Sequence, residues 1–132
     1  MKWTIFQAAN IGPNCGNLVH FALVKKMGVE DYPVQRYGGE VVRLFDVMEK
    51  QLATNAYLAG DQYSLADVIS FHWVQTFLTV LPAHFVEVAK YVGLDDESKF
   101  TNLRAWVAKI DERPAAKKTA EVYEAAPFKK TE

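Results

Sequence analysis

One segment of the chain is too apolar to lie at a protein surface, and this limits the folds that are available. After a polar turn at residues 60–63, residues 64–81 read S-L-A-D-V-I-S-F-H-W-V-Q-T-F-L-T-V-L. Ser64 and Asp67 have the spacing of a capping box, which predicts that a helix begins here. Apolar side chains then cover nearly every face of that helix, and Pro82 follows. Because such a helix must be enclosed by others, the segment predicts a bundle around a buried central helix.

The rest of the chain also has helical periodicity. Residues 32–53, 83–92, 100–113 and 115–125 predict further helices, and the first segment begins helical at once. The motif I-G-P-N-C-G at residues 11–16 interrupts that first segment, and Pro13 is expected to kink or break it. Gly38 and Gly39 should each cost about 1 kcal/mol relative to alanine, so a close approach is expected there. The prediction is an all-α domain of about five to six helices over residues 1–132.

Composition excludes several classes of partner. Fifteen basic and sixteen acidic residues give a net charge of -1 without a basic stripe, so no nucleic-acid partner is expected. The longest apolar segment, residues 65–81, is interrupted by polar side chains and does not predict a membrane span. The N-terminus does not have the pattern of a signal peptide, and a single cysteine fits a reducing compartment. A cytoplasmic protein is therefore predicted.

The residue types that could carry chemistry are few and scattered. Cys15 is the only thiol, and it is either a reactive or ligand-contacting group or a small core residue. His84 and Glu87 are too few to hold a metal, and no nucleophile–base pair or phosphate loop is present, so no catalytic residue is assigned. Arg36 precedes the glycine pair and could hold a carboxylate ligand, or it could pair with Glu40 at i+4.

Four motifs, in order, resemble the C-terminal helical domain of cytosolic glutathione transferases. They are W-T-I-F-Q-A-A-N-I-G-P-N-C-G-N-L-V-H-F, R-Y-G-G-E-V-V-R-L-F-D-V-M-E-K-Q-L, Y-L-A-G-D-Q-Y-S-L-A-D-V and F-T-N-L-R-A-W-V-A-K-I-D-E-R-P-A. The first two are similar to the bacterial Nu class and its prion-type nitrogen-regulator relatives. In this family, the Ser and Asp that correspond to Ser64 and Asp67 cap the buried central helix.

The resemblance implies a division of labour between two domains. A thioredoxin-like N-terminal domain holds most of the glutathione site and the group that activates the thiol, and nothing in this chain resembles it. The position of Arg36 implies contact with glutathione. The first helix would line the hydrophobic substrate pocket, with candidates Phe6, Asn10, Ile11, Asn14 and Cys15. Asn14 and Asn17 replace the usual Met and Gln, which makes the edge of the pocket more polar.

The prediction is therefore the C-terminal domain of a glutathione transferase, inactive in isolation. It would supply the substrate pocket and part of the glutathione clamp for conjugation to an electrophile or for disulfide reduction. The expected partners are a thioredoxin-like domain or second subunit, and a homo-oligomer is expected. The alternative is a non-catalytic interaction module, as in translation factors and aminoacyl-tRNA synthetase assemblies. The surface that the absent thioredoxin-like domain would cover predicts a large exposed apolar patch on the first two helices, and we expect this patch to promote self-association at high concentration.

Overall fold

The computed structural model describes residues 1–25 and 31–125, and within them it contains helices and no strand. The all-α prediction is confirmed. Two long rods are each built from consecutive helical segments, which we name the first rod (residues 2–25) and the central rod (residues 65–84). The elements are α1 (Lys2–Phe6), η1 (Gln7–Ile11), α2 (Gly12–Lys25), α3 (Tyr32–Leu52), α4 (Leu65–Gln75), η2 (Thr76–Val80), α5 (Leu81–His84), α6 (Val86–Val92), α7 (Thr101–Asp111) and α8 (Pro114–Ala125).

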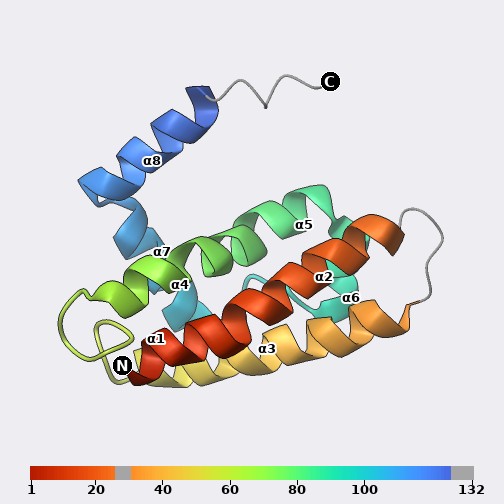
Figure 1. Cartoon of the computed structure of the whole chain (residues 1–132), viewed down its shortest axis with the longest axis horizontal. Helices are drawn as coiled ribbons and strands as arrows, with labels where there is room; N and C mark the ends of the chain where they lie inside the picture. The colour runs from red at the N-terminus through yellow and green to blue at the C-terminus, as the bar shows by residue number, and fades with distance from the viewer. Residues whose placement is uncertain (26–30, 126–132) are drawn as a thin grey trace.

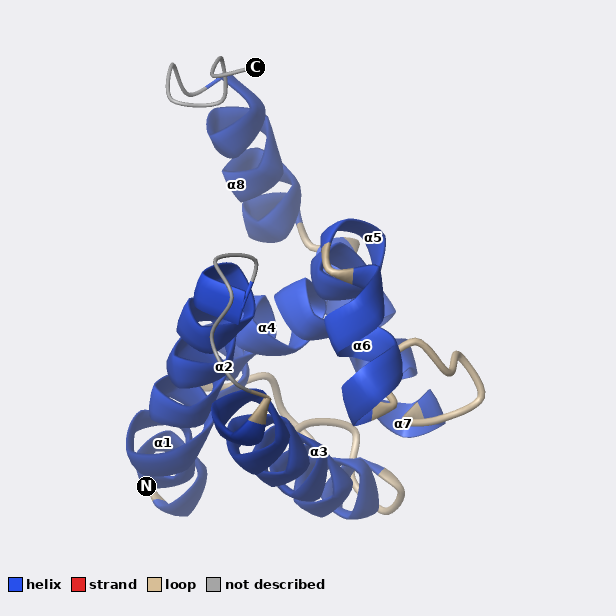
Figure 2. Cartoon of the chain, turned by 90° about the vertical axis from the view of Figure 1, so that its right-hand side faces the viewer, coloured by secondary structure: helices blue, strands red, loops and turns tan. Residues whose placement is uncertain are grey.

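The first rod and α3 lie side by side and antiparallel, and they form one wall of the bundle (Figure 1). The central rod crosses this wall and contacts it through α1, η1 and α2, while α7 packs against both α4 and α3. Figure 2 shows α6 and α7 closing the bundle on the side away from the first rod, and α8 extending away from the other helices. In the described residues, no helix is long and apolar enough to cross a membrane.

Both prolines inside the rods follow a π-helical segment, and the break that was one of the two expectations for Pro13 does not occur. The segment η1 precedes Gly12-Pro13, and η2 precedes Leu81-Pro82. A proline ring clashes with the carbonyl four residues earlier in a regular α-helix, and a wider π turn relieves such a clash. The chain therefore stays helical through Pro13, and the central rod passes Pro82 and ends at His84.

The central rod is buried on the face toward the bundle. Val74 and Phe77 are fully buried, but Leu65, Val68 and Val80 are between 46% and 62% exposed. The enclosure that the apolar composition predicted is therefore incomplete on one face. The largest fully buried side chains come from several elements: Phe45, Phe77, Ile11, Leu18, Leu44, Met48, Leu58, Leu94, Leu103, Ile110, Val34 and Val41.

A buried carboxylate joins three parts of the fold. Asp67 is fully buried, and its Oδ2 accepts hydrogen bonds from the backbone N–H and the hydroxyl of Ser64, each at 2.9 Å. Its Oδ1 accepts from the backbone N–H of Leu58 at 3.0 Å and from the indole of Trp106 at 2.9 Å. The predicted capping box is present. The same carboxylate also holds the loop before the central rod and connects it to α7.

A second carboxylate caps α7 from a distant helix. Glu49 of α3 accepts hydrogen bonds from the backbone N–H groups of Asn102 and Leu103 at 2.9 Å and 2.7 Å, and from the Asn102 side chain at 2.8 Å. These are donors that the first turn of a helix leaves without intrahelical partners. The acid also lies at the positive end of the helix dipole. Glu49 therefore positions α7 against α3.

The glycine pair in α3 explains how closely α6 packs. A Cβ atom placed on Gly38 would lie 2.1 Å from Cγ1 of Val92, whereas a Cβ on Gly39 would meet nothing within 4 Å. The expected close approach is thus confirmed at Gly38 and does not occur at Gly39. Gly93 ends α6 in the left-handed conformation at φ 71°, as its place after the helix predicted.

Candidate functional site

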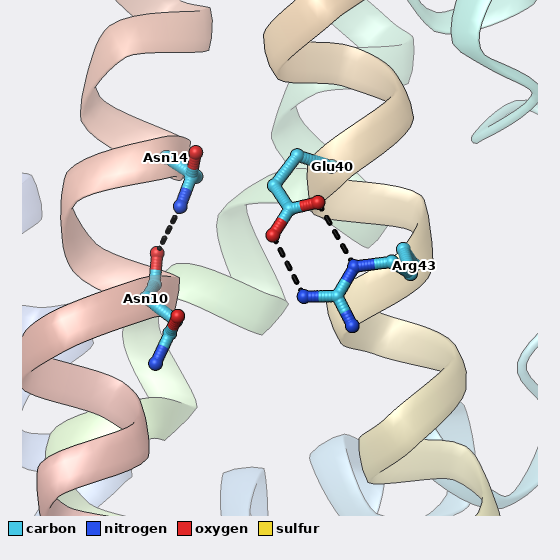
Figure 3. Close-up of polar contacts among 4 residues, drawn as sticks. All are labelled: Asn10, Asn14, Glu40 and Arg43. Atoms are coloured by element: carbon cyan, nitrogen blue, oxygen red, sulfur yellow. Dashed lines mark hydrogen bonds and ion pairs between the residues drawn. The ribbon is translucent and has the colours of Figure 1, made fainter.

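The first rod carries a polar stripe where its helical geometry changes. Asn10 lies in η1 and Asn14 one turn later in α2, and both side chains are half-buried. The side-chain amide of Asn14 donates a 2.9 Å hydrogen bond to the backbone carbonyl of Asn10 (Figure 3). Asn14 therefore supports the backbone beside the π segment. π segments are frequent at functional sites.

The five residues expected to line a substrate pocket do not share one environment. Ile11 and Cys15 are fully buried in the core, so their side chains do not reach a ligand in this structure. Phe6, Asn10 and Asn14 are half-buried and lie at the surface of the first rod. A helix of this kind turns about half of its residues inward. Only these three remain as candidates for contact with a ligand.

Burial determines the chemistry of the only thiol. The Cys15 side chain has no exposed surface, and burial raises the pKa of its thiol to about 12. A thiolate is the reactive form of cysteine, and it is scarce near neutral pH when the pKa is so high. This environment matches the interpretation of Cys15 as a core residue.

Arg36, Glu40 and Arg43 lie along one side of α3, at helical spacing. Glu40 forms a two-pronged ion pair with Arg43, at 2.9 Å from Nε to Oε2 and 2.7 Å from Nη2 to Oε1 (Figure 3). Arg36 is exposed, and among the described residues it has no hydrogen bond or ion pair. The alternative pair of Arg36 with Glu40 is therefore not formed.

Arg43 was missed by the sequence reasoning, although a signal for it exists. Glu40 precedes Arg43 at i, i+3, and an acid placed before its cation is the favoured order along a helix. The Arg43 guanidinium lowers the pKa of Glu40 first through its hydrogen bonds, while Arg36 contributes only through its charge. The structure thus assigns the acid to Arg43.

An aromatic stack anchors α3 next to Arg36. The ring of Tyr37 lies parallel to that of Phe21 in α2, with centroids 5.5 Å apart and an interplanar angle of 8°. Tyr37 is half-buried between the two helices, whereas its neighbour Arg36 is exposed. The stack joins the two helices at the turn that carries Arg36.

Apolar surface gathers near the start of the first rod. A groove of about 720 Å³ has residues from α1, from the loop before the central rod and from α4 in its wall. Among these residues, Met1, Ile5 and Leu65 are 98%, 58% and 62% exposed. A smaller groove of about 300 Å³ runs between α1 and the end of α3, and it includes Phe6 and Val47. Figure 1 marks the N-terminus and α1 at one end of the bundle. In the described part of the chain, no three His, Cys, Asp or Glu residues are grouped to hold a metal ion.

Comparison with known proteins gives a consistent result. A family model described as "Glutathione S-transferase, C-terminal domain" matches residues 31–109. The disulfide-bond oxidoreductase YghU of Escherichia coli is 31% identical over 116 residues, which are 88% of this chain and 37% of that protein.

Solved structures of glutathione transferases resemble the chain in fold and in sequence. A glutathione transferase family member from Pseudomonas fluorescens, solved with two glutathione molecules bound, superposes with a TM-score of 0.73 at 30% identity. The match covers 89% of this chain and 48% of that one. A glutathione transferase from Burkholderia graminis, with two glutathione molecules per subunit, gives a TM-score of 0.71 at 32% identity and covers 89% and 46% of the two chains. The chain thus spans less than half the length of these relatives.

Proposed function

The chain belongs to the family of glutathione S-transferase C-terminal domains, and from this premise we propose that it supplies the helical half of a glutathione-dependent active site. In this proposal, Arg36 forms part of the glutathione clamp. Phe6, Asn10 and Asn14 form the exposed wall of the substrate pocket on the first rod. The observation that carries the proposal is that Arg36 is exposed and forms no ion pair with any described residue, while Glu40, four residues further along α3, is engaged by Arg43.

The chemistry of glutathione fits binding by the exposed guanidinium of Arg36. Glutathione carries two carboxylates, and a guanidinium binds a carboxylate through two parallel hydrogen bonds. Since Arg36 has no ion-pair partner among the residues that the structure describes, it has no such pair to break before it binds a ligand. The two solved relatives that contain glutathione support this choice of ligand.

We propose disulfide reduction as the reaction, with conjugation to an electrophile as the other possibility. YghU is named a disulfide-bond oxidoreductase, and the polar wall of Asn10 and Asn14 favours a polar substrate over a purely apolar one. A glutathione thiolate attacks one sulfur of the substrate disulfide and releases the other as a thiol. A second glutathione thiolate then attacks the mixed disulfide, which yields glutathione disulfide and the second substrate thiol.

The nucleophile in this scheme belongs to glutathione. Cys15 is buried and its pKa is raised to about 12, so it does not supply the attacking thiolate. Lowering the pKa of the glutathione thiol requires a group at that thiol. We assign that group to a thioredoxin-like domain, located elsewhere in the same protein or in a second subunit of a dimer. We therefore expect the 132-residue chain to be inactive by itself, and we propose that the complete enzyme acts in cytoplasmic detoxification.

A second candidate function is a non-catalytic interaction module. The exposed side chains of Met1, Ile5 and Leu65 beside the larger groove favour it, because exposed apolar surface marks sites of protein contact. Under this alternative, the chain binds a protein partner and Arg36 has no ligand.

Calorimetric titration of the chain with reduced glutathione distinguishes the glutathione clamp from the non-catalytic interaction module. We expect micromolar binding that Arg36→Ala weakens about tenfold, which corresponds to about 1.4 kcal/mol. Lys90→Ala is the matched control, since it removes one exposed positive charge from α6. Equal weakening by both variants, or no heat at millimolar glutathione, would contradict the clamp and favour the interaction module.

A further inference from the structure

Glu40 has two arginines within reach along α3. Arg36 precedes it by four residues and Arg43 follows it by three, and both spacings place side chains next to each other on a helix. A two-pronged contact with one guanidinium fixes the orientation of a carboxylate, and so restricts the directions from which a second guanidinium can approach it. The two arginines therefore compete for one acid.

The structure shows which arginine holds the acid. Both oxygens of Glu40 accept from Arg43, at 2.9 Å and 2.7 Å, and Arg36 has no ion pair among the described residues. Helical geometry explains the choice, because an acid placed before its cation interacts better with it than one placed after it. The Glu40 side chain is also the less exposed member of the pair, at 21% against 58% for Arg43.

We infer that the Glu40–Arg43 ion pair is a positioning element that keeps Arg36 free to bind an anionic group of the ligand. This inference rests on the proposed function of Arg36 as part of a glutathione clamp. Glu40 is an internal competitor for the Arg36 guanidinium, and Arg43 restrains it by holding both of its oxygens in a two-pronged contact. Arg43 thus acts on ligand binding through Glu40 and does not touch the ligand itself.

The surroundings of the pair support this role. The Tyr37–Phe21 stack joins α3 to α2 beside Arg36, so a change of ion-pair partner does not require the helices to separate. Arg36 and Arg43 are both exposed, and their side chains can change rotamer without disturbing the core. Loss of Arg43 therefore leaves Glu40 free to turn back toward Arg36. The charge of Arg36 also lowers the pKa of Glu40, but it contributes less than the hydrogen bonds from Arg43.

The first test needs no ligand. The pKa of Glu40 is measured by carboxyl NMR titration in the wild-type chain and in Arg36→Gln, Arg43→Gln and the double variant. With Arg43 present, Arg36→Gln should raise this pKa only slightly, because Arg36 then acts on Glu40 through its charge alone. In the Arg43→Gln background, the same change should raise it by roughly 0.2 to 0.4 pH unit, because Glu40 then loses its remaining partner. An equal response to Arg36→Gln in both backgrounds would overturn the inference.

The second test measures glutathione binding. Arg43→Gln should weaken binding about twofold, the expected effect of a competing helical ion pair. The double variant Glu40→Gln/Arg43→Gln should restore wild-type affinity, because it removes the competitor as well. A double variant that binds as weakly as Arg43→Gln would overturn the inference.

The two proposals fail in different ways. A wild-type chain that binds no glutathione contradicts the clamp, whereas a Glu40 pKa with equal sensitivity to Arg36 in both backgrounds contradicts the selection by Arg43. Thermal unfolding of each variant confirms that the helix is intact. Because Arg36 and Arg43 are exposed, we expect their substitution to leave the fold intact.

Discussion

The indole N–H of Trp106 donates a 2.9 Å hydrogen bond to Oδ1 of Asp67, and both side chains are buried. The two residues are 39 positions apart, so this bond joins the start of the central rod to α7. The same Oδ1 accepts the backbone N–H of Leu58, while Oδ2 is held by Ser64. The Asp67 carboxylate thus accepts four hydrogen bonds, and one of them comes from Trp106, which lies outside the local capping motif.

We expect Asp67→Ala to destabilise the fold strongly, by about 3 to 5 kcal/mol, because it leaves buried donors without acceptors. Trp106→Phe removes one of the four hydrogen bonds and should cost about 1.5 to 3 kcal/mol. Urea unfolding measures both losses. Asp61→Ala, an exposed acid in the preceding loop, should change the free energy of unfolding by less than about 0.5 kcal/mol. Asp67→Ala as mild as this control would disprove the structural role of the carboxylate.

For the glycine pair of α3, we predict that alanine substitutions at the two neighbouring positions change the free energy of unfolding in opposite directions. Gly39→Ala should stabilise the chain by about 0.4 to 1 kcal/mol, since its Cβ meets nothing and alanine favours the helix. Gly38→Ala should destabilise it, because its Cβ would lie 2.1 Å from Cγ1 of Val92 and α6 would have to move. Midpoints of thermal unfolding distinguish the two. Effects of the same sign would show that α6 does not pack on Gly38.

Burial of Cys15 predicts a loss of stability in alkali. The thiol pKa is about 12 in the folded chain against 9.0 for a free thiol, so between these values the unfolded chain has lost a proton that the folded chain keeps. Stability from this group is complete below pH 9.0 and declines as the pH rises toward 12. The wild-type chain should therefore lose about 1 kcal/mol more than Cys15→Ala between roughly pH 8.5 and pH 10. Parallel stability curves for the two chains would contradict the burial.

The apolar surface beside the larger groove predicts self-association. Ile5→Glu and Leu65→Glu should each weaken self-association about tenfold, because each places a charge where apolar surface would be buried. Sedimentation velocity over a concentration series measures the change. Val122→Glu in α8 is the control, since Val122 is 60% exposed and lies outside both grooves. A wild-type chain that stays monomeric at high concentration would contradict the prediction, and an equal effect of Val122→Glu would show that the patch has no special role.

Much of the fold could be predicted because its signals are local. Helix periodicity, the Ser64–Asp67 capping box and the helix stop at Gly93 each depend on residues within one or two turns. The π segments could not be predicted from the same local rules. Pro13 indicated a kink or a break, whereas the structure widens the turn before Pro13, as it does before Pro82, and continues the helix.

The environment of the candidate site residues was harder to predict from the sequence than the helices were, because it depends on the tertiary structure. Periodicity alone did not separate Ile11 and Cys15, which face the core, from Asn10 and Asn14, because a π turn changes the register of the helix between Gln7 and Ile11. Glu40 had two possible partners by spacing, and the geometry of α3 assigned it to Arg43.

By itself, the sequence determined that this chain forms helices, where most of them begin and end, and that residues 64–81 form their centre. These properties follow from short-range backbone preferences and from the pattern of apolar residues. Only the tertiary structure decided which polar groups meet. Trp106 completes the Asp67 site, and Glu49 caps α7 across more than 50 residues, because packing brings distant buried donors and acceptors to positions where each must be satisfied.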